Sequence, residues 1–293
     1  MKAVFAFCLI CVLFLSGCAR RGGESVSPES TVTASSVIGI GITSAAELAA
    51  FLQEGGKSAQ LAADIDMGDT MLTLAAERGG VELIGGGHVI RGNAPCVIRL
   101  EDGCSLTLSD VAVEAGQTGL GLLGGGSLGG EFSVTAGMNA IQAAGAVTVA
   151  TGSSLTLRAE AGSGIACAGL TLEEKAKLGV SASAFALSTG RGDFTLRQGA
   201  RAVCEASGDS AVKTDGTLIL ERDAYLEAVN TGEHNGAEVG SLIAVSDATL
   251  KAKGGQNGVG LFVVELRADV ALKGSSKPEL RVEAGRGTVS FLS

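Results

Sequence analysis

The residues best suited to contact a ligand lie in a polar segment in the last third of the chain, residues 231–238. The candidate binding residues are Glu233, His234, Asn235 and Glu238 within this segment, together with Tyr225 nearby. Their side chains offer both donors and acceptors to a polar ligand. The segment adds about eight to ten residues to a repeat described below, and insertions in repeat proteins often form binding loops. A tolerated loop without a function explains the same residues.

Cys18 offers a different chemistry, because its thiol can carry a lipid. Lys2 is followed by an apolar run, Ala3–Leu15, which is too short for a membrane-spanning helix but suits the core of a signal peptide. Leu15-Ser16-Gly17-Cys18 then resembles the lipobox of bacterial lipoproteins. The resemblance implies a diacylglyceryl group on Cys18, cleavage before Cys18 and acylation of the new amino group. Two or more acyl chains would anchor the protein stably in a membrane.

The chain therefore divides into three predicted parts. Residues 1–17 form the signal peptide, and residues 18–36 form a lipidated cysteine with a polar, flexible tether. Residues 37–293 form one folded domain. We expect this domain to lie outside the cytoplasm, at a bacterial cell surface or in the periplasm, with membrane lipid as a partner.

Four cysteines belong to the folded domain: Cys96, Cys104, Cys167 and Cys204. An exported protein can form disulfides, and Cys96 with Cys104 is one possible pair. The alternative is that these cysteines are buried thiols that act as small hydrophobic residues. Their spacings match no metal-binding pattern.

The folded domain has an internal repeat of about 23 residues. Three series of apolar residues recur with steps of 19 to 25 residues: Leu61, Leu83, Leu106, Leu128, Val147, Leu170, Phe194 and Leu218; Ile90, Val113, Val134, Leu157, Val180, Val203 and Leu226; and Leu74, Val97, Leu120, Ile141, Ile165, Leu187 and Val212. Each residue lies in a short alternating stretch, which indicates a strand with one buried face. Three strands per repeat, joined by glycine-rich corners, describe a coil, and stacked coils bury the apolar faces. We therefore predict an all-β parallel β-helix solenoid of about nine or ten coils.

Residues 43–54 are the exception and predict a short helix. Ser44-Ala45-Ala46-Glu47 is a capping-box pattern. Leu48, Phe51 and Leu52 follow at helical spacing. Such a helix would cover the open end of the solenoid, whose first strand would otherwise be free to pair with another chain.

Two segments after this helix carry a second resemblance. Leu61-Ala62-Ala63-Asp64-Ile65-Asp66 and Gly85-Gly86-Gly87-His88-Val89-Ile90 resemble the start of pectin-lyase-like right-handed parallel β-helices. The resemblance implies a right-handed solenoid. That family includes polysaccharide lyases, polygalacturonases, adhesins and sugar-binding surface proteins, so the fold does not choose among functions. The polygalacturonase motifs of the family are absent from this sequence.

Catalytic and metal-binding patterns are also missing. Glycoside hydrolysis needs two facing carboxylates about 5–10 Å apart, and the outward residues after the second series stack no such pair: Glu114, Thr135, Arg158, Ser181, Cys204 and Glu227. The segment Asp64–Asp69 departs from the ligand pattern of an EF-hand. We expect no cofactor and no metal, and enzymatic activity is not the favoured interpretation.

Charge and surface pattern favour a carbohydrate partner over a nucleic acid. The net charge of −9 is opposite to the basic footprint of nucleic-acid binding. Hydroxyl and small residues follow the first series and could form a glycan platform, although threonine is also a good strand former. We expect a lipid-anchored surface protein with a non-catalytic β-helix that binds carbohydrate or mediates adhesion. The alternatives are a polysaccharide lyase or glycoside hydrolase of the same fold, and a purely structural envelope lipoprotein.

The anchor gives the first prediction. Cys18→Ala should abolish lipidation, because no other thiol follows the predicted cleavage point directly, and the precursor should migrate as the uncleaved chain. Metabolic labelling with a fatty-acid analogue measures this. Label retained by the Cys18→Ala protein would place the lipid elsewhere and contradict the prediction.

Overall fold

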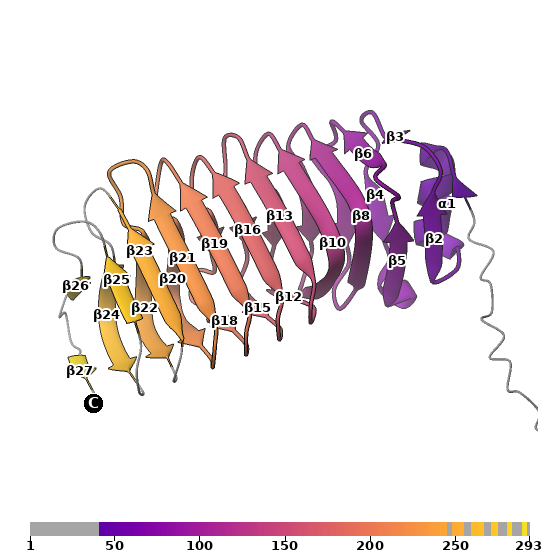
Figure 1. Cartoon of the computed structure of the whole chain (residues 1–293). Coiled ribbons are helices and arrows are strands. Elements are labelled where there is room, and N and C mark those ends of the chain that lie inside the picture. The colour runs from indigo at the N-terminus through magenta and orange to yellow at the C-terminus, as the bar shows by residue number, and fades with distance from the viewer. Residues whose placement is uncertain are drawn as a thin grey trace, which may run out of the picture. The chain divides into compact units, whose positions relative to one another are not determined.

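The structure is a computed structural model that describes residues 41–244 and 248–254 with their side chains. Four further strands are described as backbone: β24 (Val259–Leu266), β25 (Ala271–Gly274), β26 (Leu280–Val282) and β27 (Val289–Phe291). Together they form a parallel β-solenoid of about eight turns with about 24 residues per turn (Figure 1). This confirms the predicted fold class with slightly fewer coils. Cys18, the predicted signal peptide and the predicted tether lie outside the described residues.

Three parallel ladders of strands form the walls, and five long strands turn a corner and contribute to two ladders. Ladder 1 contains β1 (Gly41–Ile42), β2 (Ser58–Leu61), β5 (Gly80–Ile84), the first halves of β8 (Ser105–Ala115) and β10 (Gly126–Ala136), β12 (Ala146–Val149), β15 (Gly169–Leu172), β18 (Phe194–Leu196), the second halves of β20 (Val212–Leu220), β22 (Ala237–Ala244) and β24, and β27. Ladder 2 contains β3 (Ile65–Asp66), β6 (Val89–Gly92), the second halves of β8 and β10, β13 (Ser154–Ala159), β16 (Lys177–Ala182), β19 (Arg201–Ala206), β21 (Tyr225–Asn230), β23 (Thr249–Lys253) and β25. Ladder 3 contains β4 (Leu72–Leu74), β7 (Cys96–Leu100), β9 (Thr118–Leu122), β11 (Ile141–Ala143), β14 (Ile165–Ala166), β17 (Leu187–Ser188), the first halves of β20, β22 and β24, and β26.

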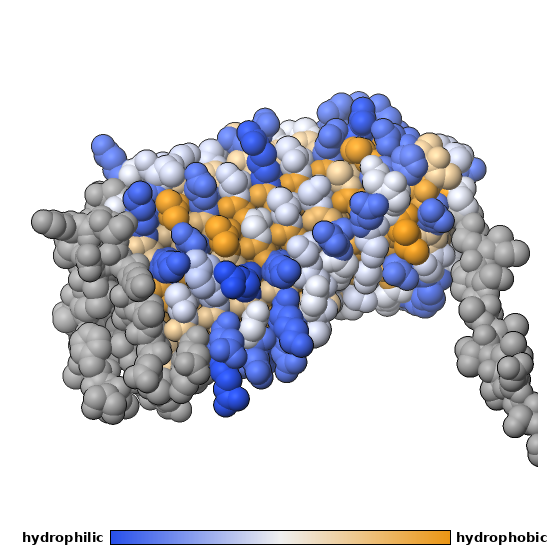
Figure 2. Space-filling view, in the orientation of Figure 1, coloured by the Kyte–Doolittle hydropathy of each residue, from blue (hydrophilic) through white to orange (hydrophobic). Residues whose placement is uncertain are grey.

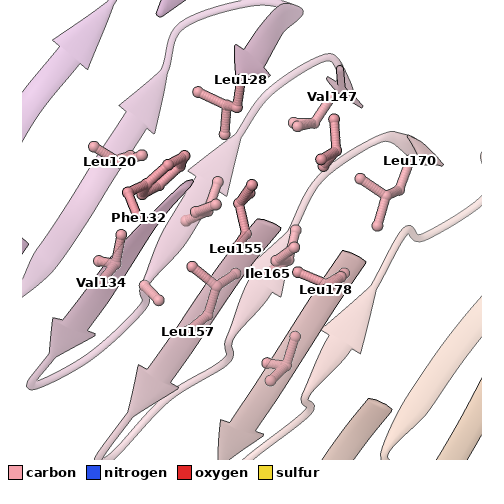
Figure 3. Close-up of a cluster of buried hydrophobic side chains, with 14 of the residues drawn as sticks. Leu120, Leu128, Phe132, Val134, Val147, Leu155, Leu157, Ile165, Leu170 and Leu178 are labelled. Atoms are coloured by element: carbon pink, nitrogen blue, oxygen red, sulfur yellow. The ribbon is translucent and has the colours of Figure 1, made fainter. Parts of the chain in front are cut away.

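The core fills the space between the three ladders. Inward side chains from all three, among them Leu120, Leu128, Leu157 and Ile165, point toward one another in Figure 3 and are at most 1% exposed. Full burial of one such side chain stabilises the fold by about 1.5–3 kcal/mol. Outward positions carry most of the charge, and hydrophilic side chains project from the face shown in Figure 2 with less polar residues between them.

The predicted apolar series are confirmed in part, and the register corrects them by one or two residues. In ladder 2, Val180 lies opposite Cys204, whereas the sequence pattern chose Val203. Val203 points outward and is 46% exposed, while Cys204 is fully buried. The repeat lengthens by one residue at this step, so a fixed period of 23 selects the wrong face. In ladder 3, Ile98 rather than Val97 lies opposite Leu120.

Slips of two residues are harmless to the burial pattern. Leu128 lies opposite Val149, not Val147, and Leu83 lies opposite Leu108, not Leu106. Because side chains alternate along a strand, a shift of two residues stays on the buried face. The sequence pattern therefore identified the buried residues more accurately than their partners.

The predicted helix is present as α1 (Ala45–Glu54) and packs against β4 at the first coil (Figure 1). The Ser44 hydroxyl accepts a hydrogen bond from the Glu47 amide at 3.3 Å. The Glu47 carboxylate accepts one from the Thr43 amide at 2.7 Å, one residue earlier than in a standard capping box. These bonds, led by the Thr43 amide, lower the pKa of Glu47.

One corner between ladder 1 and ladder 2 repeats a left-handed backbone conformation on successive coils. Gly152, Lys175, Gly199 and Asp223 have φ values of 69°, 59°, 68° and 57°. Each of the first three amides donates to a carbonyl of the next coil, so the corner continues the stack. Glycine adopts this conformation at little cost, but an L side chain costs about 1–2 kcal/mol.

This corner gives a matched pair of stability predictions. Lys175→Gly should raise the free energy of unfolding by about 1 kcal/mol, because it removes the strain of a side chain at positive φ. Gly152→Ala should lower it by a similar amount, since the added methyl meets open space and only the backbone preference changes. Chemical denaturation measures both. Changes of the same sign in the two variants would contradict this account.

Candidate functional site

A polar groove lies on the outer face of ladder 2, where its strands end. It has a volume of about 480 Å³. It is lined by Asp66, Arg91, Gly92, Asn93, Glu114, Ala115, Gly116, Thr135, Ala136, Gly137 and Glu160. We call it the acidic groove. Its lining comes from β3, β6, β8, β10 and the corner after β13, so it crosses successive coils.

An outward column of ladder 2 forms one wall of this groove. Asp66 lies opposite Arg91, Arg91 opposite Glu114, and Glu114 opposite Thr135. Adjacent coils are about 4.8 Å apart, so Asp66 and Glu114 are about 10 Å apart along the solenoid with Arg91 between them. The groove thus offers alternating acceptors, a five-donor guanidinium and a hydroxyl.

The arginine is held by carboxylates on both sides. Its Nη2 lies 3.6 Å from Asp64 Oδ2, and its Nε lies 3.8 Å from Glu114 Oε2. Asp64 also contacts His88 Nδ1 at 3.1 Å and accepts a bond from the Val89 amide at 3.1 Å. The Val89 amide, followed by His88, lowers the pKa of Asp64. Arg91 therefore lines the groove between two carboxylates, in solvent-exposed ion pairs that orient it only weakly.

Glycines form the floor at the corner between ladder 2 and ladder 3. A methyl group on Gly137 would come within 2.2 Å of the Gly116 carbonyl oxygen, and one on Gly116 within 3.0 Å of the Asn93 amide oxygen. The neighbouring coil therefore restricts side chains at these two positions, whereas the equivalent positions of the flanking coils carry Asn93 and Glu160. This leaves backbone between those two side chains at the bottom of the groove.

A second, smaller groove of about 260 Å³ lies over the beginning of the same strands. Its polar lining consists of Asp110, Glu131, Ser133, Ser154 and Thr156. Asp110 has a φ of 57° at the point where β8 and β10 shift register. Both grooves open on the outer face of ladder 2.

Sequence reasoning did not find the acidic groove. Glu114 and Thr135 were identified from the sequence as successive outward residues, but this column was not extended to the two preceding coils. Asp66 follows the buried Ile65, and Arg91 follows the buried Ile90 in the same way. This repeated pattern of a buried residue followed by a charged one could have identified both residues. Glu160 lies after the end of β13, where no strand alternation applies.

The predicted binding loop at 231–238 is not a large insertion. The extra eight to ten residues are obtained only if Ile243 is taken as the member of the third series that follows Val212. Ile243 is instead an outward residue of ladder 1, opposite Ile219. The third-ladder partner of Val212 is Ala237. The connection between β21 and β22 then spans 231–236, one residue more than the 207–211 connection of the preceding coil.

Glu238 and Asn235 form hydrogen bonds with the preceding coil, whereas the hydrogen bond of the His234 amide lies within its own coil. Glu238 belongs to β22, where it lies 3.5 Å from Lys213 Nζ and accepts a bond from the buried Ser210 hydroxyl at 3.2 Å. The His234 amide donates to Asn230 Oδ1 at 3.1 Å. The Asn235 carbonyl accepts from the Ala211 amide, and Glu233 is exposed.

Tyr225 lies apart from that segment, at the other end of β21. The Arg201 guanidinium is 4.4 Å from the centre of its ring, and Lys251 Nζ is 5.1 Å from it. Arg201 is on the preceding coil and Lys251 on the following one. Its hydroxyl donates to Glu227. Tyr225 therefore joins three coils by cation–π contacts and is separated from His234 by the length of a strand.

The four cysteines of the domain are free thiols, so the structure contains no Cys96–Cys104 disulfide. Burial raises the pKa of Cys96 to about 11 and those of Cys167 and Cys204 to about 12. These thiols are neutral at physiological pH and pack as hydrophobic groups.

Within the described residues, no group of three or more histidine, cysteine or acidic side chains could hold a metal ion. None of the helices in the described residues is long and apolar enough to cross a membrane.

Comparisons with protein-family models, curated proteins and solved structures found no match to this chain.

The Tyr225 contacts give a stability prediction. Tyr225→Leu should lower the free energy of unfolding by about 1–2 kcal/mol, because two cation–π contacts at a partly exposed site are lost. Tyr225→Phe keeps the ring and should cost less. Chemical denaturation of both variants measures the difference, and equal losses would show that the hydroxyl, not the ring, carries the contact.

Proposed function

We propose that this chain is a lipid-anchored bacterial surface protein whose solenoid binds carbohydrate in the acidic groove without cleaving it. The observation that supports binding is the groove itself, a polar hollow of about 480 Å³ on a rigid, repeated scaffold. That volume lies in the range of small-molecule sites. The anchor and the location outside the cytoplasm rest on the lipobox resemblance of Leu15–Cys18.

The chemistry of the groove suits sugar hydroxyls. Carboxylates of Glu114 and Glu160 accept hydrogen bonds, Arg91 donates them, and Thr135 and Asn93 do both. The glycine floor lets a flat ligand approach the backbone. Each hydroxyl of a sugar can act as donor and acceptor, so this mixture of groups fits it better than it fits an apolar ligand.

The excess of acidic side chains in the groove disfavours negatively charged carbohydrates. Asp66, Glu114 and Glu160 outnumber Arg91, and the sequence carries a net charge of −9. A polyuronate would be repelled, whereas neutral or amino sugars would not. The sequence has no tryptophan and one tyrosine, and Tyr225 is engaged by cations. Binding should therefore be polar, with affinity that depends on several weak contacts.

A glycoside hydrolase is the second candidate, and the spacing of Asp66 and Glu114 favours it. Their backbone separation of about 10 Å is close to the carboxylate separation in inverting enzymes. The contacts of the two groups argue against it. Asp66 Oδ1 accepts a hydrogen bond from the Gly68 amide at 2.8 Å, and Glu114 lies 3.8 Å from Arg91. Arg91 also lies between the two carboxylates, where the scissile bond would have to lie.

The binding prediction uses carboxylate-to-amide substitutions. Glu114→Gln with Glu160→Gln should weaken binding of neutral or amino-sugar oligosaccharides about tenfold, because bonds to charged acceptors are worth about 1.5–3 kcal/mol. Glu174→Gln, at an exposed corner elsewhere, is the control. A glycan array followed by calorimetry measures the effect.

Two results would overturn this proposal. One is a wild-type protein that binds no glycan on a broad array, which would favour the structural envelope role. The other is release of new reducing ends from a bound polysaccharide, lost in Glu114→Gln, which would establish the hydrolase.

A further inference from the structure

An outward column of ladder 2 carries charges of opposite sign at equal distances from Ser181. After Asp66 and Arg91, which line the acidic groove, the column continues through Glu114, Arg158, Ser181, Glu205 and Lys253, with neutral residues between. Arg158 lies one coil before Ser181 and Glu205 one coil after it. Glu114 lies three coils before Ser181 and Lys253 three coils after it. At both distances the two charges are opposite.

Three of these four charges have no ion-pair partner in the described part of the chain. Arg158, Glu205 and Lys253 are exposed and form no contact of that kind with a described residue. Glu114 has only Arg91, at 3.8 Å. The column therefore presents largely uncompensated charges of both signs in a fixed order.

We propose that this face of ladder 2 pairs with the same face of a second copy of the chain, in antiparallel orientation. The twofold axis would pass near Ser181, parallel to the strands. Such an axis reverses the order of the coils and keeps each column opposite itself, as an isologous interface requires. Arg158 then faces Glu205 of the second copy, and Glu114 faces Lys253. Each pair occurs twice, so the interface contains four ion pairs.

The neighbouring outward columns bring no like charges together in this arrangement, apart from one residue at the margin. About the same axis, Arg201 faces Ser154 of the second copy, and Lys251 faces Ala112 of the second copy. Lys177, in the same coil as Ser181, is the charged residue that would face Lys177 of the second copy. It lies four residues along β16, about 13 Å from Ser181, and is exposed at the margin, where its side chain can turn into solvent.

The size of the face sets the strength of the pairing. Seven coils and a six-residue strand give about 600 Å² per copy, at the lower end of specific interfaces. Ion pairs at such an interface add specificity and a strong dependence on salt. We therefore expect a weak dimer that dissociates at high ionic strength.

A cysteine on the axis tests the geometry. In the full-length chain in detergent, Ser181→Cys should be linked to its own copy by a short bismaleimide reagent, because facing sheets lie about 10 Å apart and the two thiols meet at the axis. Thr135→Cys is the matched control: it is exposed in the same column, but its copy would be about 19 Å away along the solenoid, too far for the same reagent. We expect cross-linking of Ser181→Cys at least about tenfold faster, and loss of that advantage at about 0.5 M salt.

Charge reversal then tests the pairing. In the Ser181→Cys background, Arg158→Glu should slow cross-linking, and adding Glu205→Arg should restore it, because both charges of the pair are then reversed. Circular dichroism and melting identify any variant that does not fold. Equal rates for Ser181→Cys and Thr135→Cys, or a double reversal that is as slow as the single one, would overturn the proposal.

Discussion

The requirement that each coil return in register onto the one before it governs the whole solenoid. Parallel strands bond to their neighbours only when the backbone repeats at about 4.8 Å. A turn of about 24 residues must therefore close on itself, whatever its sequence. Where a coil gains a residue, as between Val180 and Cys204, a corner absorbs the change and the strands stay aligned. The core follows from this alignment, because equal positions stack and bury one another.

Close stacking also explains the distribution of glycine. At the corner between ladder 2 and ladder 3, the neighbouring coil excludes a side chain at Gly137 and restricts one at Gly116. At the corner between ladder 1 and ladder 2, Gly152 and Gly199 provide the left-handed conformation instead. The same residue type thus meets two different physical demands. The first of these corners leaves bare backbone beside charged side chains, and the acidic groove lies there.

The outer faces are free of the packing requirement, so function can be encoded there. Each outward column is a line of side chains spaced by the coil repeat, and a few substitutions change its charge without disturbing the core. The column through Arg91, Glu114 and Lys253 belongs both to the proposed binding groove and to the proposed pairing face. Because Glu114 contributes to both, ligand binding and pairing would compete for the same surface.

The sequence by itself determined the repeat, the strand alternation, most of the buried residues and the helix at 45–54. These depend on local periodicity and on apolar burial, which the order of residues records directly. Tertiary structure alone decided the register, because a slip of two residues leaves the burial pattern unchanged. The register therefore placed Ala237, not Ile243, opposite Val212 in ladder 3, which makes 231–236 an ordinary connection. It also brought four charged residues into one groove: Asp66, Arg91, Glu114 and Glu160. Residues from different coils become neighbours only through the pairing of strands, and no local pattern in the sequence specifies that pairing.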